Sequence, residues 1–299
     1  MTTQRLQRAT REGSRVALVT CAELADLDAD DRLVISPLAA RGVRAEPAVW
    51  DADLDWSRYD LTVLRSPWDY VARRDEFVAW AWHVPALANP AEVVEWNTDK
   101  RYLAELANAG VPVVPTTWLA PGEAWTPGGS GECVIKPTVG AGSVDSGRYD
   151  LADADHRRLA AEHVARLHAA GRAVMAQPYL SAVDTHGETA LLYVGGRFSH
   201  AVRKGPLLDG PDAGVEGLYK AEDIAPRGPS TAELAAADGA LAAVPGGAAR
   251  LLYARVDLIP GPSGEPLLVE LELTEPSLFL AHGPGAADRF ADAIVAGLG

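Results

Sequence analysis

Three acidic residues and one arginine lie in two apolar segments near the C-terminus, spaced so that they could form a cation site. The segments are "LLYARVDLI", with Arg255 and Asp257, and "LLVELELTEP", with Glu270 and Glu272. Strand residues two positions apart point to the same face, so each segment would bury one face and expose a charged one. The intervening "PGPSGEP" is typical of a hairpin loop, which predicts that the two segments pair.

The predicted hairpin brings these charges onto one surface. With the Ser-Gly dipeptide as a two-residue loop, Asp257 lies opposite Glu270, and Arg255 lies opposite Glu272. Directly opposed acids destabilise a sheet unless another group compensates them. Mg²⁺ is a candidate because it binds a few carboxylates together with phosphate oxygens. The alternative is a solvated sheet face on which Arg255 serves as a local counter-ion.

A lysine followed by a flexible loop in "VIKPTVGAGSVDSGR" could hold a phosphate group. Lys136 ends an apolar strand, and the loop after it contains three glycines, among them Gly140 and Gly142, and two serines, among them Ser143. Glycines allow backbone N–H groups to approach phosphate oxygens closely. The GxxxxGK[ST] and GxGxxG motifs are both absent from the sequence. An ordinary surface loop is the alternative.

Two further segments could contact a ligand. The strand end "MAQPYLS" could present backbone groups to a planar base, although core packing of Met175 and Tyr179 explains it equally well. In the hairpin "ETALLYVGGRFSHAVRK", a Gly-Gly turn would place Glu188 opposite Arg203. These two would form a cross-strand ion pair or face the same ligand.

A polar and aromatic cluster follows one of the N-terminal strands. Open α/β sheets commonly bind ligands at the ends of their strands, although a hydrogen-bonded turn is the alternative here. The residues of this segment, "LRSPWDY", that could hold a substrate are Arg65, Ser66, Trp68, Asp69 and Tyr70.

The composition favours small-molecule chemistry. The 299 residues are 48% apolar, enough for a substantial core in two or three domains. A net charge of −14 argues against binding to nucleic acid or to an anionic membrane. Only Cys21 and Cys133 occur, so a reducing, cytoplasmic location is expected and a zinc site is not. Residues 1–14 lack an apolar stretch and are expected to form a disordered tail.

Three successive units would position these residues. In residues 15–97, short β-rich runs alternate with helical segments, which predicts an α/β domain with a parallel sheet. Residues 98–181 open with the helix "NTDKRYLAELANAG", which Asn97 or Thr98 would cap, and continue with strands around the glycine-rich loop. Residues 182–299 are mainly antiparallel hairpins and a terminal helix. The expected fold class is therefore α/β (α+β).

Taken in order, these motifs resemble those of ATP-grasp ligases, from about Arg15 to the end of the chain. The set "RSPWDY", "NTDKRYL", "FSHAVRK" and "ELELTEPSLFL" is similar to a glutathione-synthetase-like subgroup. The resemblance implies an N-terminal α/β domain, a central lid domain and a mainly antiparallel C-terminal domain, with ATP held between the last two. One departure is Glu272, where many members of the family carry Asn.

The resemblance also implies roles for individual residues. ATP would be bound by Lys100, Lys136, Gly140, Gly142, Ser143, Gln177, Tyr179, Leu180 and Glu188. Mg²⁺, with Mn²⁺ as an alternative ion, would be bound by Asp257, Glu270 and Glu272. Arg255 and Lys136 would act in catalysis. The "RSPWDY" residues and Arg203 are the candidates for holding the substrate.

The implied reaction is ATP-dependent formation of a carbon–nitrogen bond through an acyl phosphate. Within the subgroup we favour a cyclo-ligase, in which the attacking nitrogen belongs to the same molecule as the carboxylate. The alternatives are an intermolecular carboxylate-amine ligase, a kinase and a noncatalytic ATP-binding module. The expected partner is a small amino-acid-like substrate, not nucleic acid or a membrane, and a homo-oligomer is left open.

Overall fold

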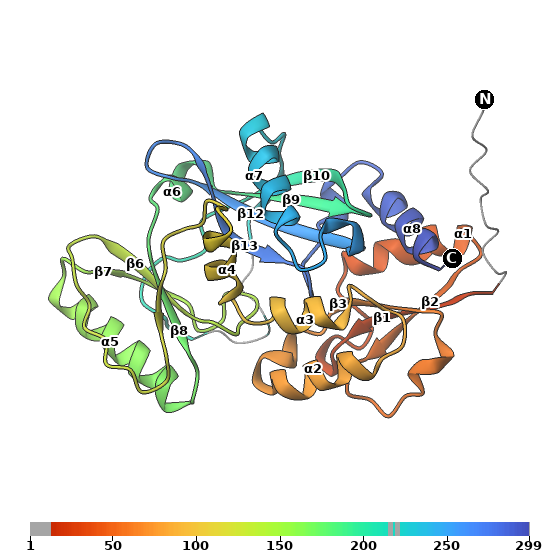
Figure 1. Cartoon of the computed structure of the whole chain (residues 1–299), viewed down its shortest axis with the longest axis horizontal. Coiled ribbons are helices and arrows are strands. Elements are labelled where there is room, and N and C mark those ends of the chain that lie inside the picture. The colour runs from red at the N-terminus through yellow and green to blue at the C-terminus, as the bar shows by residue number, and fades with distance from the viewer. Residues whose placement is uncertain (1–12, 215–217, 219–221, 299) are drawn as a thin grey trace.

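Three β-sheets organise the computed structural model, which describes residues 13–214, 218 and 222–298 (Figure 1). The C-terminal sheet lies between the N-terminal sheet, at the right of Figure 1, and the central sheet, at the left. One parallel sheet and two antiparallel sheets confirm the expected α/β (α+β) class. The predicted tail lies almost wholly outside the described residues, and the domain boundaries stay a prediction.

The N-terminal sheet is parallel, as predicted, with the strand order β2-β1-β3-β4. Its strands are β1 (Arg15–Thr20), β2 (Arg44–Val49), β3 (Leu61–Ser66) and β4 (Leu87–Ala88). Its helices are α1 (Ile35–Ala40), α2 (Arg74–His83) and α3 (Ala91–Asn97). Because β3 is buried along its whole length, its sequence shows no alternation of polar and apolar residues.

The central sheet is antiparallel, with the order β5-β8-β6-β7. Its strands are β5 (Thr117–Leu119), β6 (Glu132–Pro137), β7 (Gly147–Asp150) and β8 (Val174–Pro178). Helix α5 (Ala154–Ala169) packs against it and is capped by the Asp153 side chain, which accepts two backbone N–H bonds. Sheet and helix enclose an apolar core of their own, while Met175 of β8 joins the core of the C-terminal sheet.

The predicted start of the helix at Asn97 is wrong, because the chain turns after α3 and the helix, α4 (Tyr102–Asn108), begins five residues later. Asn97 ends α3, and its side chain donates to the carbonyl of Leu271 and accepts from the N–H of Leu273, each at 2.7 Å. These long-range bonds replace the capping role expected of Asn97. Lys100 consequently lies in the turn that precedes α4.

The C-terminal sheet is antiparallel, with the order β11-β10-β9-β12-β13. Its strands are β9 (Glu188–Val194), β10 (Arg197–Lys204), β11 (Ile224–Pro226), β12 (Tyr253–Pro260) and β13 (Pro266–Glu272). Its helices are α6 (Ala182–His186), α7 (Thr231–Ala242) and α8 (Ala286–Gly297). Helices α7 and α8 cover opposite faces, because alternate β9 residues join two different cores.

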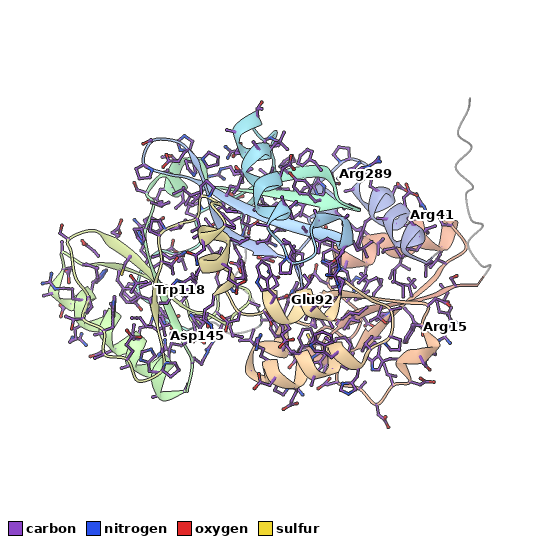
Figure 2. All side chains as sticks on the ribbon, viewed as in Figure 1. Arg15, Arg41, Glu92, Trp118, Asp145 and Arg289 are labelled. Carbon is purple, nitrogen blue, oxygen red and sulfur yellow. The ribbon has the colours of Figure 1, made fainter. Side chains whose placement is uncertain are left out.

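The N-terminal and C-terminal sheets share a core, and polar contacts reinforce it. Apolar side chains of β1, β3, β9 and α8 form one cluster. Arg41, which directly follows α1 and is labelled in Figure 2, binds Asp292 of α8 at 2.7 Å and Asp288 at 3.2 Å. The N-terminal and C-terminal sheets are therefore held together by one apolar core and by ion pairs at the surface.

Short 3₁₀ helices occupy several connections. They are η1 (Ala22–Leu24), η2 (Asp31–Val34), η3 (Trp56–Arg58), η4 (Trp68–Arg73), η5 (Ala248–Arg250) and η6 (Leu280–His282). Of these, η4 matters most for the site, because it begins one residue after β3 ends and carries three of the predicted substrate residues, Trp68, Asp69 and Tyr70.

The register of the acidic hairpin confirms the predicted charged pairs but not the predicted loop. Asp257 faces Glu270 and Arg255 faces Glu272. Near the loop, however, the pairing is offset by one residue, and a bulge at Val269 restores the predicted register before the acids are reached.

The predicted pairing of Glu188 with Arg203 is wrong. A bulge at Ser199 shifts the β9–β10 register by one residue, so that Glu188 faces Lys204 and Arg203 faces Thr189. Successive strand residues point to opposite faces, so the shift exchanges which basic residue shares a face with Glu188.

Candidate functional site

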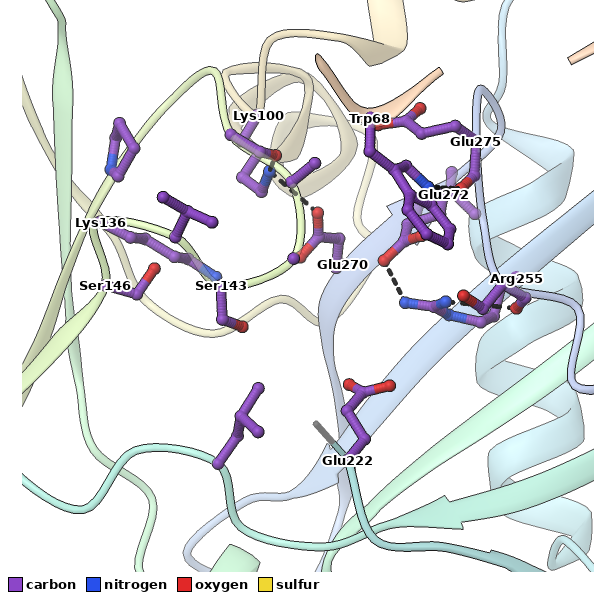
Figure 3. A pocket seen from close by; sticks show the side chains of 18 of the residues that line it. Trp68, Lys100, Lys136, Ser143, Ser146, Glu222, Arg255, Glu270, Glu272 and Glu275 are labelled. Carbon is purple, nitrogen blue, oxygen red and sulfur yellow. Dashed lines mark hydrogen bonds and ion pairs between the residues drawn. The ribbon is translucent and has the colours of Figure 1, made fainter. Parts of the chain in front are cut away.

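A cleft lies where the three units meet. One cavity of about 130 Å³ is lined by η4, the turn before α4, the glycine-rich loop and β13 (Figure 3). A second of about 120 Å³ is lined by the end of β8 and by β9. Both are bordered by Lys136, Ser143, Lys204 and Glu270, so they are adjoining parts of one cleft.

The acidic hairpin supplies one wall, and each of its acids has a cationic partner. Asp257, which is 1% exposed, accepts from Arg255 at 2.9 Å and from Lys204 at 3.0 Å. Arg255 also bonds Glu272 across the strand pair. Glu270 pairs with Lys100 at 3.0 Å (Figure 3). The hairpin thus carries an alternating network of charges rather than a solvated sheet face.

Carboxyl groups outnumber cationic groups in the described part of this cleft. Six carboxyl groups belong to it, those of Glu188, Glu222, Asp257, Glu270, Glu272 and Glu275, against the four cationic groups of Lys100, Lys136, Lys204 and Arg255. Burial raises the pKa of Glu272 to about 8 and that of Glu275 to about 7. The pKa values of Asp257 and Glu270 are lowered despite burial, because Arg255 and Lys100 respectively stabilise their charged forms.

This set of carboxyl groups makes the cleft suitable for a cation. Carboxylate oxygens are the ligands that Mg²⁺ and Mn²⁺ prefer, and a bound divalent ion would favour the ionised forms of Glu272 and Glu275. Within the described ranges, no three acidic, histidine or cysteine side chains already converge in a metal-binding arrangement. The carboxylate oxygens instead form ion pairs with cationic side chains: Asp257 with Arg255 and Lys204, Glu270 with Lys100, and Glu272 with Arg255.

The two predicted phosphate-binding lysines come together opposite this wall. Lys136 projects from β6 into the cleft, and burial lowers the pKa of its amine. Lys100 donates to the carbonyl of Gly140 at 2.6 Å, which ties it to the glycine-rich loop. Gly140, Gly142 and Ser143 also line the cavity. The predicted phosphate cluster is therefore assembled from two separate parts of the chain.

The glycine-rich loop is held by the body of the central unit. Asp145, labelled in Figure 2, pairs with Arg166 of α5 at 3.2 Å and with Arg172. Ser143 and Asp145 have φ angles of 57° and 55°, in the left-handed region. The loop conformation therefore depends on side-chain anchors as well as on glycine.

The predicted base-binding residues line the second cavity. Gln177 donates to the hydroxyl of Thr116 at 2.9 Å, so its amide is oriented by the residue that directly precedes β5. The Tyr179 ring is covered by the guanidinium of Arg148, 3.6 Å from the ring centroid. Leu180 and Glu188 complete this side, and Glu188 pairs with Lys204 at 3.2 Å.

Only part of the predicted substrate set reaches the cleft. Trp68 and Tyr70 line it, whereas Arg65, Ser66 and Asp69 do not. Arg65 is fully buried and pairs with Asp31 at 2.9 Å. Ser66 bonds the Thr20 hydroxyl at 3.1 Å, and Asp69 accepts from Trp50 at 2.8 Å.

Arg203 also lies outside the set of cleft-lining residues. It donates to the carbonyl of His186 at 3.1 Å and pairs with Asp223 at 3.6 Å. The β10 bulge explains this position, because it turns Lys204 rather than Arg203 towards Asp257.

Sequence reasoning missed Lys204, Glu222 and Glu275, all of which line the cleft. The sequence signal for Lys204 is its place at the end of "FSHAVRK", next to Arg203, which the predicted register favours. Glu275 lies three residues after Glu272, beyond the strand alternation that selected the other acids. Glu222 follows a segment without a recognisable pattern.

The sequence and structure match known proteins along the whole chain. Residues 16–91 match the family model "D-cycloserine synthetase DcsG, N-terminal domain". The cycloserine biosynthesis protein DcsG of Streptomyces lavendulae is 41% identical over 297 residues, covering 93% of this chain and 97% of the relative. The part of the chain that the structure describes contains no helix that meets the length and apolarity needed to cross a membrane.

Two solved structures share the fold of this chain. The crystal structure of D-cycloserine synthetase DcsG has a TM-score of 0.84 and 37% identity, covering 96% of this chain and all 100% of that one. The RimK domain protein ATP-grasp from Sphaerobacter thermophilus has a TM-score of 0.65 and 19% identity, covering 94% and 99% of the two chains. The second match extends the shared fold to more distant proteins.

Proposed function

The chain belongs to the DcsG family of ATP-grasp ligases, and we propose on that basis that it is an ATP-dependent cyclo-ligase converting O-ureido-D-serine to D-cycloserine. Full-length similarity to DcsG is the observation that carries this proposal. Within its family the chain resembles O-ureido-D-serine cyclo-ligase, an enzyme of D-cycloserine antibiotic biosynthesis. The proposed substrate supplies both the carboxylate and the attacking nitrogen.

The three lysines and the loop would hold the nucleotide. Lys100, Lys136 and Lys204 converge on the cavity that the glycine-rich loop borders, so they can bind the phosphate oxygens of ATP. The residues around Gln177 and Tyr179 would hold the base in the adjoining cavity. In this arrangement the terminal phosphate would point towards the acidic hairpin.

The hairpin would position the metal and stabilise the reacting carboxyl group. Asp257, Glu270 and Glu272 are the proposed ligands of Mg²⁺ or Mn²⁺, which when bound would neutralise charge on the terminal phosphates. Arg255 lies beside these acids and lines the cavity, so its guanidinium can stabilise the oxyanion that develops at an acyl carbon. Closing the loop over the cleft would keep water from an acyl phosphate.

The proposed reaction balances as two displacements and a hydrolysis. The substrate carboxylate attacks the γ-phosphorus of ATP, and ADP leaves. The nitrogen bonded to oxygen in the ureido group then attacks the acyl carbon, and phosphate leaves as the five-membered ring closes. One water hydrolyses the remaining carbamoyl group, which departs as carbon dioxide and ammonia. Intramolecular attack removes the need to orient a second substrate.

The test measures phosphate released by the purified protein with MgATP, with and without O-ureido-D-serine, followed by mass spectrometry of the product. Substrate-dependent phosphate together with the mass of D-cycloserine is the expected result. A need for a separate amine would favour an intermolecular ligase, and a stable phosphorylated product would favour a kinase. ATP binding without turnover of any carboxylate would favour a noncatalytic module. A cytoplasmic location and a homo-oligomer stay predictions.

A further inference from the structure

The segment that follows β13 is fixed in place by side chains of the N-terminal unit. The Trp68 indole donates to the backbone carbonyl of Glu275 at 3.0 Å. The buried Arg65 guanidinium donates to the carbonyl of Pro276 at 2.6 Å. The Tyr70 hydroxyl, on a side chain that is 2% exposed, bonds the Glu275 carboxylate. Backbone and side chain of Glu275 are therefore both held by the "RSPWDY" segment.

Glu275 points into the cleft without a cationic partner. It lines the cavity together with Trp68 and Tyr70. Among the described residues, it forms no ion pair within 4 Å, in contrast to Asp257, Glu270 and Glu272, each of which has one. A partly buried carboxylate has lost some of its hydration and here has no cation to compensate, so a cationic ligand group would be favoured at this position.

The position of Glu275 beside Arg255 fits the short separation between the two charged groups of an α-amino acid. Figure 3 shows Glu275 and Trp68 beside Glu272 and Arg255, across the cavity from Lys136. In an α-amino acid, a single carbon separates the ammonium nitrogen from the carboxyl carbon. A group that binds the ammonium must therefore lie next to the group that stabilises the reacting carboxyl. Glu275 and Arg255 meet this condition.

We propose that Glu275 binds the α-ammonium group of the substrate, and that Arg65, Trp68 and Tyr70 are positioning residues for Glu275. This inference rests on the proposed function, since it takes the cleft to be the site of an amino acid substrate. Trp68 and Tyr70 add aromatic surface next to the carboxylate, which suits an ammonium ion. The predicted substrate segment thus acts largely through Glu275.

The experiment combines the Glu275→Gln variant with a substrate that lacks the amine. Steady-state kinetics are measured with O-ureido-D-serine and with its deaminated analogue, 3-(ureidooxy)propanoate. For the first compound, Glu275→Gln is expected to raise KM about 100-fold, because a desolvated charge pair is lost. The KM for ATP should be unchanged, and the thermal midpoint should not fall. For the analogue, wild type and variant should be equally poor.

Two further variants separate binding from structure. Tyr70→Phe removes the hydroxyl that orients Glu275 but keeps the ring stacked on Phe77, so a smaller rise in the same KM is expected. Glu76→Gln makes the same chemical change on the exposed face of α2 and should alter neither KM. Circular dichroism and thermal midpoints identify any variant that fails to fold.

Three results would overturn the inference. One is a fall in kcat at unchanged KM in Glu275→Gln, which would make Glu275 a proton acceptor. Another is an unchanged kcat and an unchanged KM in that variant. The third is a rise in KM for the deaminated analogue that equals the rise for O-ureido-D-serine. If wild type does not turn over O-ureido-D-serine, the proposed function fails separately. Turnover of a panel of α-amino acids and of their deaminated counterparts then tests Glu275. If wild type accepts the amino acids and the deaminated compounds equally, Glu275 does not bind an α-ammonium group.

Discussion

At the residue scale, the acids of the cleft differ because their neighbours differ. Asp257 is buried and Glu270 is partly exposed, and Lys100, Arg255 and Lys204 keep both ionised. Glu272 shares Arg255 with Asp257, so burial dominates and its pKa rises. This is also the position at which many ATP-grasp ligases carry Asn. The third acid therefore holds its proton more readily than the other two, because the nearby cations already bond other carboxylates.

Replacing Glu270 with Gln should abolish ADP release and leave the fold intact. The variant removes a proposed metal ligand and the partner of Lys100 while keeping the side-chain volume. Coupled detection of ADP and a thermal melt measure the two properties. Glu265→Gln, in the exposed loop of the same hairpin, is the matched control and should retain activity. Turnover at the wild-type rate by Glu270→Gln would refute the metal assignment.

The pH dependence of stability provides a second prediction at this scale, away from the cleft. Arg58, Arg15 and Tyr59 bond Glu46 and lower its pKa from 4.5 to about 2. A lowered folded-state pKa stabilises the protein above pH 4.5, and this contribution is lost as the pH falls towards 2. Because the cluster is partly exposed, its contribution is about 1 kcal/mol.

Glu46→Gln should therefore reduce the free energy of unfolding at pH 6 by about 1 kcal/mol and have no effect near pH 2. Urea denaturation of wild type and variant between pH 2 and pH 7 measures this difference. A difference that is independent of pH would show that the carboxylate charge does not cause the stabilisation.

At the element scale, the glycine-rich loop depends on α5. Arg166 of α5, together with Arg172 just beyond it, holds Asp145. Arg172 also donates to the carbonyl of Val139 at the start of the loop, at 2.9 Å. The central unit has its own core, and the loop is tied to it through these two arginines.

Asp145→Asn should loosen this loop while preserving its backbone conformation, because Asn tolerates the left-handed region. We expect the KM for ATP to rise about fivefold, as for the loss of about 1 kcal/mol, with faster amide exchange in residues 138–147. Asp155→Asn, on the exposed first turn of α5, is the control. Unchanged exchange in Asp145→Asn would show that the loop does not depend on this anchor.

At the scale of the whole molecule, Arg65 joins parts of the chain that lie far apart in sequence. It pairs with Asp31 of η2 and bonds Pro276, 211 residues further on. Its guanidinium also stacks over the rings of Tyr253 and Phe290. One buried side chain thus links the N-terminal sheet to the wall of the cleft.

Arg65→Met should lower the free energy of unfolding by about 3 to 5 kcal/mol, because Asp31 is left buried without its cation. Urea denaturation measures the change. Adding Asp31→Asn to this variant removes the unpaired charge and should recover part of the loss. No recovery in the double variant would show that the cost comes from lost packing instead.

The sequence by itself determined the fold class, most strands and the charged pairs of the acidic hairpin, because these follow from local periodicity and turn residues. The tertiary structure alone decided which side chains face the cleft. A one-residue bulge exchanged Arg203 for Lys204, since strand neighbours point to opposite faces. The bond between Trp68 and Glu275 spans 207 residues, a distance that no local pattern encodes. Arg65 likewise became a buried link because its partners come from distant elements.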